Sequence, residues 1–205
     1  LPDREPLLDP DDWLPPQYPL LLAAGTKANQ KGFDLLMPVF AELGRRDSSL
    51  HLALLGLAPG RYRGLDQQAW LRQFLENEPD LQARLLLPGV SGSMASWYKR
   101  ANIFVLPSRY EGFPNVLLEA MAAGCACIAS DCLTGPADLI SHGENGLLMS
   151  PQATSTDWVE AIAGLLADPK RCLQLGEKAM EVRERYDAVR LRRDFLEALR
   201  KLHHG

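Results

Sequence analysis

The chain has 205 residues, 46% of them hydrophobic and 23% charged, and these proportions are typical of a globular protein. Its formal net charge of −4 creates no global field that favours nucleic acid, so we expect no nucleic-acid partner. No apolar run approaches the roughly eighteen residues that a membrane-spanning helix needs. The chain starts without Met and without a signal-peptide pattern, so we expect a fragment or a processed chain.

Residues 1–19 hold six of the fifteen prolines and five acidic residues, which predicts a stiff, extended linker with nothing to bury. Within it, Asp9 and Asp11 superficially match a known Asp-x-Asp metal-binding motif. No strand precedes them to hold that geometry, so an acidic linker is the favoured interpretation.

From residue 19 onward, short apolar runs alternate with amphipathic helical patterns. The runs predict strands at 19–25, 50–56, 83–89, 102–108, 125–130 and 146–150. The patterns predict helices from about 34 to 46 (with Pro38 inside), and at 66–78, 93–101, 114–124, 135–141 and 155–203. Six alternations with continuous apolar strands predict an α/β fold: a doubly wound, mostly parallel six-stranded sheet (Rossmann-like), of strand order 3-2-1-4-5-6, with C-terminal helices.

The four cysteines, Cys125, Cys127, Cys132 and Cys172, form no C-x-x-C pair and no disulfide spacing. The run "CACIAS" reads as a buried strand, in which Cys is a common small core residue. We therefore expect reduced thiols, no metal site and a cytoplasmic enzyme.

Two loops are expected at the ligand crevice, because this fold binds ligands at the carboxyl ends of strands 1 and 4, where the strand order reverses. They are "GTKANQKG" (25–32) and "SRYEGFPN" (108–115). The first carries Lys27 and Lys31, and lysine is a common phosphate binder, although two loop lysines are usually only surface charges. The P-loop pattern GxxxxGK[ST] and the dinucleotide pattern GxGxxG are both absent, which argues against a nicotinamide enzyme.

The second loop leads into a predicted helix that carries a glutamate among apolar residues. Pro114 suits the first helical position, and Gly112 lets the backbone turn and lets a ligand approach closely. The free N–H groups of the first helical turn would then attract an anion. Glu119, about one turn further in, would accept ribose hydroxyls and gain its partners only when a nucleotide binds. The plain alternatives are a solvated helix face for Glu119 and a loop cap for Glu111.

These residues resemble a known family. The stretch "PSRYEGFPNVLLEAMAAGCACIASDCLTGPADLISHGENGLLMSP" (107–151) is similar to the donor-binding domain of retaining glycosyltransferases of the GT-B fold, the glycosyltransferase group 1 (family 4) type. That group contains bacterial polysaccharide, lipopolysaccharide and glycolipid transferases. Glu111 and Glu119 match its E-x7-E hallmark, and "GTKANQKGFDLL" (25–36) looks like its G-R-L-x-x-x-K-G-F-D-x-L loop.

The resemblance implies a role for each matching residue. Glu111 would be catalytic, facing the transferred sugar and the positive charge that develops at its anomeric carbon, and Glu119 would hold the ribose. Lys31 would neutralise the diphosphate, and the backbone near Gly89 and Val90 would contact the base. The remaining donor-binding candidates are Gly25, Thr26, Lys27, Gly112, Phe113, Asn115 and Val116.

Two positions depart from the family pattern. Thr26 stands where the family usually has Arg, so one of two diphosphate cations is lost; either Lys27 compensates or donor binding is weak. Asp138 stands where Glu is more common, a minor change at a short helix start.

The expected organisation is a linker (1–19), a nucleotide-sugar donor domain (20–185) and a C-terminal helix and tail (186–205). The acceptor, a glycan or glycolipid, would bind to an N-terminal domain that is absent here, so we expect this chain alone to be inactive. Five basic residues of the last segment would reach that domain or make peripheral membrane contact, although a solvated helix face is favoured: Arg190, Arg192, Arg193, Arg200 and Lys201.

The function that the sequence favours is therefore transfer of a sugar from a nucleotide-diphospho-sugar with retention of configuration. We expect no cofactor and no metal, because helix amides and lysine are able to stabilise the leaving diphosphate electrostatically. The alternatives are a sugar-nucleotide epimerase of the same fold and a non-catalytic module that binds a nucleotide or a protein.

Overall fold

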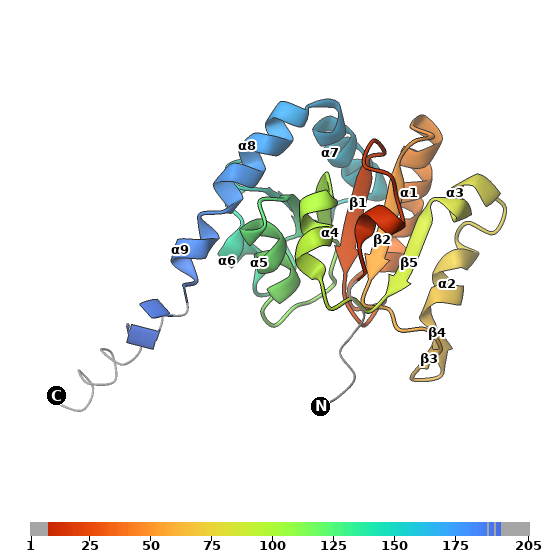
Figure 1. The fold of residues 1–205 in the computed structure, drawn as a ribbon, viewed down its shortest axis with the longest axis horizontal. Coiled ribbons are helices and arrows are strands. Elements are labelled where there is room, and N and C mark those ends of the chain that lie inside the picture. The colour runs from red at the N-terminus through yellow and green to blue at the C-terminus, as the bar shows by residue number, and fades with distance from the viewer. Residues whose placement is uncertain (1–7, 188, 191, 194–205) are drawn as a thin grey trace.

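The apolar runs form one six-stranded sheet in a computed structural model that describes residues 8–187, 189–190 and 192–193. The strands lie in the order β5-β2-β1-β6-β7-β8, and every neighbouring pair is parallel (Figure 1). This confirms the predicted fold class and the predicted order 3-2-1-4-5-6. The strands are Leu20–Ala24 (β1), His51–Leu55 (β2), Leu85–Gly89 (β5), Ile103–Leu106 (β6), Ala126–Ser130 (β7) and Leu147–Met149 (β8).

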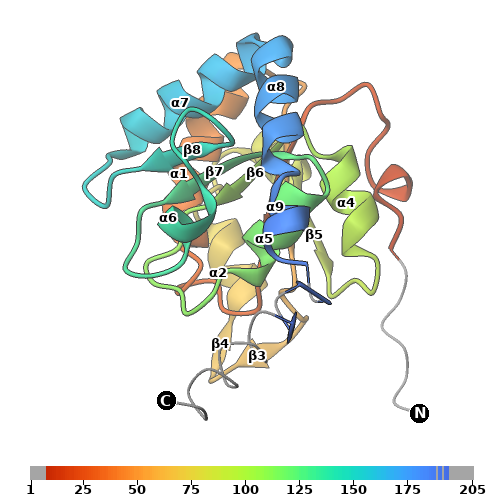
Figure 2. The same cartoon turned by 90° about the vertical axis from the view of Figure 1, so that its left-hand side faces the viewer.

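Helices cover both faces of the sheet. One face packs against α1 (Phe33–Arg46), α2 (Gln67–Gln73), α3 (Pro79–Ala83) and α7 (Ser155–Ala167). The other packs against α4 (Met94–Arg100), α5 (Asn115–Ala122), α6 (Pro136–Leu139) and α9 (Val182–Arg185). Figure 2 shows α7 and α4 on opposite sides of the strands. The helix α8 (Pro169–Ala179) runs from one face to the other, with Leu175 in the first core and Ala179 in the second.

The strand β1 shows why the apolar runs are continuous rather than alternating. Successive side chains point to opposite faces of a strand. Leu21 and Ala23 join the core under α1, whereas Leu20, Leu22 and Ala24 join the core under α4 and α5. Since both faces are covered by helices, every residue of β1 is buried and apolar.

The segment between β2 and β5 differs from its prediction. The helix expected over 66–78 is α2, which ends at Gln73, and the short helix α3 follows it. A hairpin of β3 (Arg61–Tyr62) and β4 (Leu65–Asp66) precedes α2. This hairpin extends beyond the carboxyl ends of β2 and β5 (Figure 1). Its turn places Arg63 at φ 51° and Gly64 at φ 86°. An Arg at positive φ carries no sequence signal for a hairpin, which is why the pattern was missed.

From Leu8 onward, the proline-rich N-terminal segment is folded against α4, so the expectation of a linker with nothing to bury is wrong. Leu14 is 2% exposed and belongs to the second core. The Trp97 indole N–H donates to the Leu8 carbonyl at 2.9 Å. The Arg100 guanidinium donates to the carbonyls of Pro15 and Tyr18 at 2.7 and 2.8 Å. Leu8 and Leu14 therefore anchor this segment, and the domain boundary at residue 20 stays a prediction.

The predicted C-terminal helix and tail (186–205) lie largely outside the described residues, and Arg200 and Lys201 lie wholly outside them. In the part of the chain that the structure describes, no helix has the length and apolar character to cross a membrane.

Two buried thiols at the start of β7 predict a stability that falls at alkaline pH. Burial raises the pKa of the Cys125 thiol to about 12 and that of Cys127 well above its ordinary value. Unfolded thiols ionise near pH 8.5. The thiols' contribution to stability is therefore complete below that pH and is lost progressively from about pH 8.5 towards the folded pKa, at about 1.4 kcal/mol per pH unit for each thiol.

Urea unfolding between pH 8.5 and 10 measures this slope. Cys125→Ala removes one of the two buried thiols, so it should reduce the pH dependence of the unfolding free energy by the contribution of one thiol. An unchanged slope in that variant would contradict the assignment of the alkaline loss to the buried thiols.

Candidate functional site

The two predicted loops meet at the centre of the sheet. The strands β1 and β6 are neighbours, and the helices that follow them, α1 and α5, cover opposite faces. The loop 25–32 follows β1 and the loop 107–114 follows β6. Both loops therefore lie at the switch point where open α/β sheets bind ligands.

Three glycines lie at the carboxyl ends of the adjacent strands β1, β2 and β5: Gly25, Gly56 and Gly89. The Gly25 N–H donates to Leu55 at 2.9 Å, and the Gly56 N–H donates to Gly89 at 2.7 Å. A Cβ on Gly56, whose φ is +90°, would lie 2.8 Å from the carbonyl oxygen of Gly25. Gly56 was missed by the sequence analysis, because a single glycine after a strand carries no motif.

The loop after β1 is a tight turn that presents Lys31. The N–H groups of Lys31, Gly32 and Phe33 donate to Lys27, Asn29 and Ala28 at 2.9, 3.1 and 3.0 Å. The Lys31 side chain runs across Gly25, where a Cβ would lie 2.5 Å from the lysine Cγ. The missing side chain at Gly25 therefore makes room for the lysine stem.

Lys31 and Glu111 form an ion pair between the two loops. The lysine Nζ lies 2.7 Å from Oε1 of Glu111, and the two side chains are only 13% and 5% exposed. The buried Ser108 hydroxyl donates to the same oxygen at 2.5 Å. Within the described residues, Oε2 of Glu111 accepts no hydrogen bond. The carboxylate is thus held firmly by one oxygen while its other oxygen has no protein partner there.

A second ion pair joins the loop after β6 to the first turn of α1 and was missed by the sequence analysis. The Arg109 guanidinium donates to both carboxylate oxygens of Asp34 at 2.7 Å and to the Asn29 carbonyl at 2.6 Å. The Arg109 N–H also donates to Gln30 at 2.9 Å. Side-chain hydrogen bonds from Arg109 to Asp34 raise the pKa of the guanidinium. The two loops therefore behave as one braced unit.

The loop after β7 supports Glu111 from behind. The Thr134 hydroxyl donates to the Glu111 carbonyl at 2.5 Å, and Thr134 itself has φ +70°. A Cβ on Gly135 would lie 2.5 Å from Cδ of Pro114. This packing fixes the backbone that carries Glu111.

Glu119 is exposed, so the apolar residues around it in sequence do not bury it. The buried Tyr98 hydroxyl donates to its Oε2 at 3.0 Å. The expectation that Glu119 gains partners only with a ligand is therefore wrong. Burial raises the pKa of Tyr98 far above its ordinary value, and the nearby Glu119 charge raises it further. Tyr98 thus stays a neutral donor that orients the glutamate.

Two details of the second loop also differ from expectation. Pro114 precedes the helix as its N-cap, so α5 begins at Asn115. Gly112 does not have a positive φ, and a Cβ there would meet nothing within 4 Å, so the turn does not require glycine. Close approach of a ligand at Gly112 stays a prediction.

The other predicted residues surround the same edge of the sheet. Thr26, Lys27 and Asn115 are exposed, Val116 and Val90 are half-buried, and Gly89 ends β5. The Phe113 ring is 43% exposed and lies 5.7 Å from the Tyr186 ring. Their roles in binding stay predictions.

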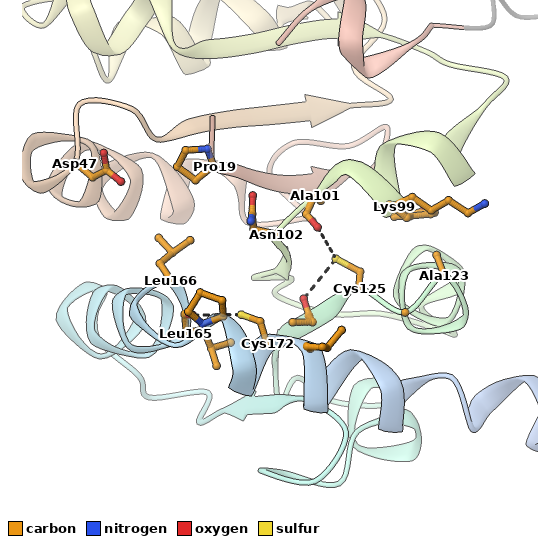
Figure 3. A pocket seen from close by; sticks show the side chains of 15 residues that line it. Pro19, Asp47, Lys99, Ala101, Asn102, Ala123, Cys125, Leu165, Leu166 and Cys172 are labelled. Atoms are coloured by element: carbon orange, nitrogen blue, oxygen red, sulfur yellow. Dashed lines mark hydrogen bonds between the residues drawn. The ribbon is translucent and has the colours of Figure 1, made fainter. Parts of the chain in front are cut away.

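Two of the cavities in the described part of the chain lie at opposite ends of the strands, and Pro107, Ser108 and Arg109 of the second loop line the larger one. One of about 860 Å³ lies at the carboxyl ends of β6, β7 and β8, between Leu35 and Trp158, and includes Ser108. The other, of about 400 Å³, lies at the opposite edge of the sheet, where Pro19, Asn102 and Cys125 line it (Figure 3). The second is therefore remote from the switch point.

A doubly wound parallel sheet with a paired carboxylate at its switch point defines a Rossmann-like α/β protein. A family model described as "Glycosyl transferases group 1" matches residues 18–168. The chain therefore belongs to the group 1 glycosyltransferases.

Three similar proteins illustrate the match. D-inositol 3-phosphate glycosyltransferase 2 of Catenulispora acidiphila is 32% identical over 178 residues, covering 84% of this chain and 41% of the relative. A crystal structure of Anabaena HepE in complex with UDP has a TM-score of 0.80 at 21% identity, covering 90% of this chain and 49% of that one. The C-terminal domain of a group 1 family glycosyl transferase (LpcC) from Francisella tularensis has a TM-score of 0.72 at 23% identity, covering 89% and 95%.

The two structural likenesses show the fold, which is that of GT-B glycosyltransferase neighbours. The chain spans less than half the length of the curated relatives that it matches.

Proposed function

We propose that this chain is the donor-binding half of a retaining glycosyltransferase that takes a sugar from a nucleotide-diphospho-sugar and passes it to a glycan, lipid-linked or other acceptor. The observation that carries the proposal is the contact between Lys31 and Glu111 at the switch point. It brings a phosphate-binding cation and a carboxylate together from two loops, at the edge where the fold binds ligands.

The proposed chemistry assigns each group a task. Lys31 and the N-terminal amides of α5 stabilise the diphosphate as it leaves, since preorganised donors aimed at developing charge lower the barrier. The unpartnered Oε2 of Glu111 faces the transferred sugar and the positive charge that develops at its anomeric carbon. Glu119, oriented by Tyr98, accepts the ribose hydroxyls. No metal or cofactor enters this scheme.

The acceptor half belongs to the same proposal. The likeness to an isolated C-terminal domain over 95% of that chain supports assigning this chain to the C-terminal half of a longer enzyme. Transfer needs an acceptor held against the donor. The chain alone is therefore inactive in transfer.

Nucleotide binding by the 205-residue chain tests the proposal. A ligand that binds only the folded state raises thermal stability. UDP, GDP, ADP and their sugar conjugates form the panel, and we expect one base series to raise the melting temperature. A chain that binds none of them would overturn the proposal.

Glu119→Ala should then weaken binding of that nucleoside diphosphate by about 1–3 kcal/mol, the scale of hydrogen bonds to a charged group. The fold should survive with a modest loss of stability, because the replaced carboxylate is exposed while the buried Tyr98 hydroxyl loses its acceptor. Calorimetry with the ribose and 2′-deoxyribose forms sharpens the test, since the variant should no longer distinguish them. Glu177→Ala, an exposed glutamate on α8, is the matched control. Unchanged discrimination in Glu119→Ala would remove this residue from the ribose site.

A further inference from the structure

A buried glutamine outside both predicted loops holds the first of them. Gln67 is the first residue of α2 and is 6% exposed. Its Oε1 accepts the Ala28 N–H at 2.7 Å, and its Nε2 donates to the Thr26 carbonyl at 3.1 Å. The side chain therefore binds the backbone on both sides of Lys27.

This contact uses both halves of the amide. A carboxamide offers one acceptor and two donors on a flat group, so it is able to pair with a backbone carbonyl and a backbone N–H at once. Methionine offers neither a strong donor nor a strong acceptor, and an ionised glutamate only accepts hydrogen bonds. A buried backbone group left without a partner is costly, so a side chain that cannot both donate and accept would leave Thr26 or Ala28 unpaired.

The two hydrogen bonds that join Gln67 to Thr26 and Ala28, which we call the clamp, lie directly before the turn that presents Lys31. Ala28 receives the Gln67 contact through its N–H, and its carbonyl accepts the Phe33 N–H at 3.0 Å. The Lys27 carbonyl, between the two clamped groups, accepts the Lys31 N–H at 2.9 Å. The backbone fixed by Gln67 is therefore the backbone that sets the origin of the Lys31 side chain.

The helix α2 holds Gln67 in place in turn. Asp66 caps α2, with its Oδ1 accepting the Ala69 N–H at 3.0 Å, and Asp66 also ends the β3–β4 hairpin. A capped first turn fixes the direction of the residue that follows the cap. The hairpin and the cap together aim the glutamine at the loop.

We propose that Gln67 is a positioning residue for diphosphate binding: it fixes the loop 25–32 so that Lys31 meets the phosphates of a nucleoside diphosphate. The inference rests on the proposed function. It assigns no contact between Gln67 and the ligand, because the side chain reaches only the backbone of the loop.

A positioning role and a merely structural role differ in which part of the ligand loses affinity. Loss of the clamp displaces Lys31, so it should weaken binding of the phosphates and spare the base and ribose. General destabilisation would weaken all ligands alike or none. The ratio between the dissociation constants of a nucleoside and its 5′-diphosphate separates the two roles.

The experiment compares Gln67→Glu and Gln67→Met with the wild-type chain by calorimetry. The probes are the one of UDP, GDP and ADP that the wild type binds most tightly, and the corresponding free nucleoside. We expect both variants to lose about tenfold in affinity for the diphosphate and less than twofold for the nucleoside. Gln82→Met is the matched control: it removes a half-buried amide that donates to the Leu75 carbonyl at 2.8 Å, away from the crevice. It should leave the ratio unchanged.

Each result has one consequence. A wild-type chain that binds none of the three diphosphates overturns the proposed function, and this inference falls with it. A wild-type chain that binds, with an unchanged ratio in the Gln67 variants, overturns only the positioning role. If neither variant folds, amide exchange in the wild type decides, since the clamp requires a protected Ala28 N–H and rapid exchange there overturns it.

Discussion

Lys31→Met should lower the free energy of unfolding by about 3 kcal/mol at neutral pH, because removing one partner of a buried ion pair leaves the other charge uncompensated. The Glu111 side chain is 5% exposed, so water reaches little of the carboxylate that remains. The Ser108 hydroxyl still donates to it, but a single neutral hydrogen bond replaces only part of the lost interaction. Urea unfolding of the 205-residue chain measures the change.

Two further variants make the interpretation specific. Lys31→Met combined with Glu111→Gln removes both charges and should recover most of the loss, since an uncharged pair has no desolvated ion. Lys27→Met should change stability by less than about 0.5 kcal/mol, as is usual for exposed side chains. Equal losses for Lys27→Met and Lys31→Met would show that the ion pair does not stabilise the fold.

The same variants weigh the two lysines in binding. Lys31 contacts Glu111 of the second loop, whereas Lys27 is exposed and lies between the two backbone groups held by Gln67. In the proposed function, a diphosphate would therefore compete with Glu111 for Lys31. Loss of Lys31 should weaken diphosphate binding more than loss of Lys27, despite the threonine at position 26.

Gly32→Ala should destabilise the chain by more than about 4 kcal/mol, a size that single substitutions seldom reach. Gly32 has φ +66°, and a Cβ there would lie 2.0 Å from the carbonyl oxygen of Pro107. The neighbour is backbone rather than the end of a flexible side chain, so the loop after β1 and the loop after β6 would have to separate. Failure of the variant to fold at 25 °C agrees with this expectation.

A second glycine isolates the steric part of that effect. Gly143 has φ +78°, and a Cβ there would meet nothing within 4 Å. Gly143→Ala should therefore cost only about 1–2 kcal/mol, the strain of an L-residue in the left-handed region. Chemical unfolding of both variants gives the comparison. If the two costs are equal, the contact with Pro107 does not limit the fold.

The six-stranded sheet could be predicted from the sequence alone, because a doubly wound sheet is recorded in local patterns. Residues such as Leu21 and Leu22 in β1 must both be apolar when helices cover both faces, and a short apolar run records that requirement directly. The strand order followed from the alternation of strands with helices. The sequence also predicted that Lys31 and Glu111 lie in two loops at the switch point, where the structure brings them into contact.

Contacts between residues far apart in the sequence were decided only by the tertiary structure. Gln67 reaches Thr26 across 41 positions, Arg109 reaches Asp34 across 75, and Tyr98 reaches Glu119 across 21. No local pattern marks such partners, since the residue type alone does not show whether a side chain is exposed or is buried and paired. The direction in which a side chain leaves its helix or loop is fixed by packing, and packing exists only once the chain has folded. For that reason the sequence identified the two loops, and only the fold showed which side chains hold them in place.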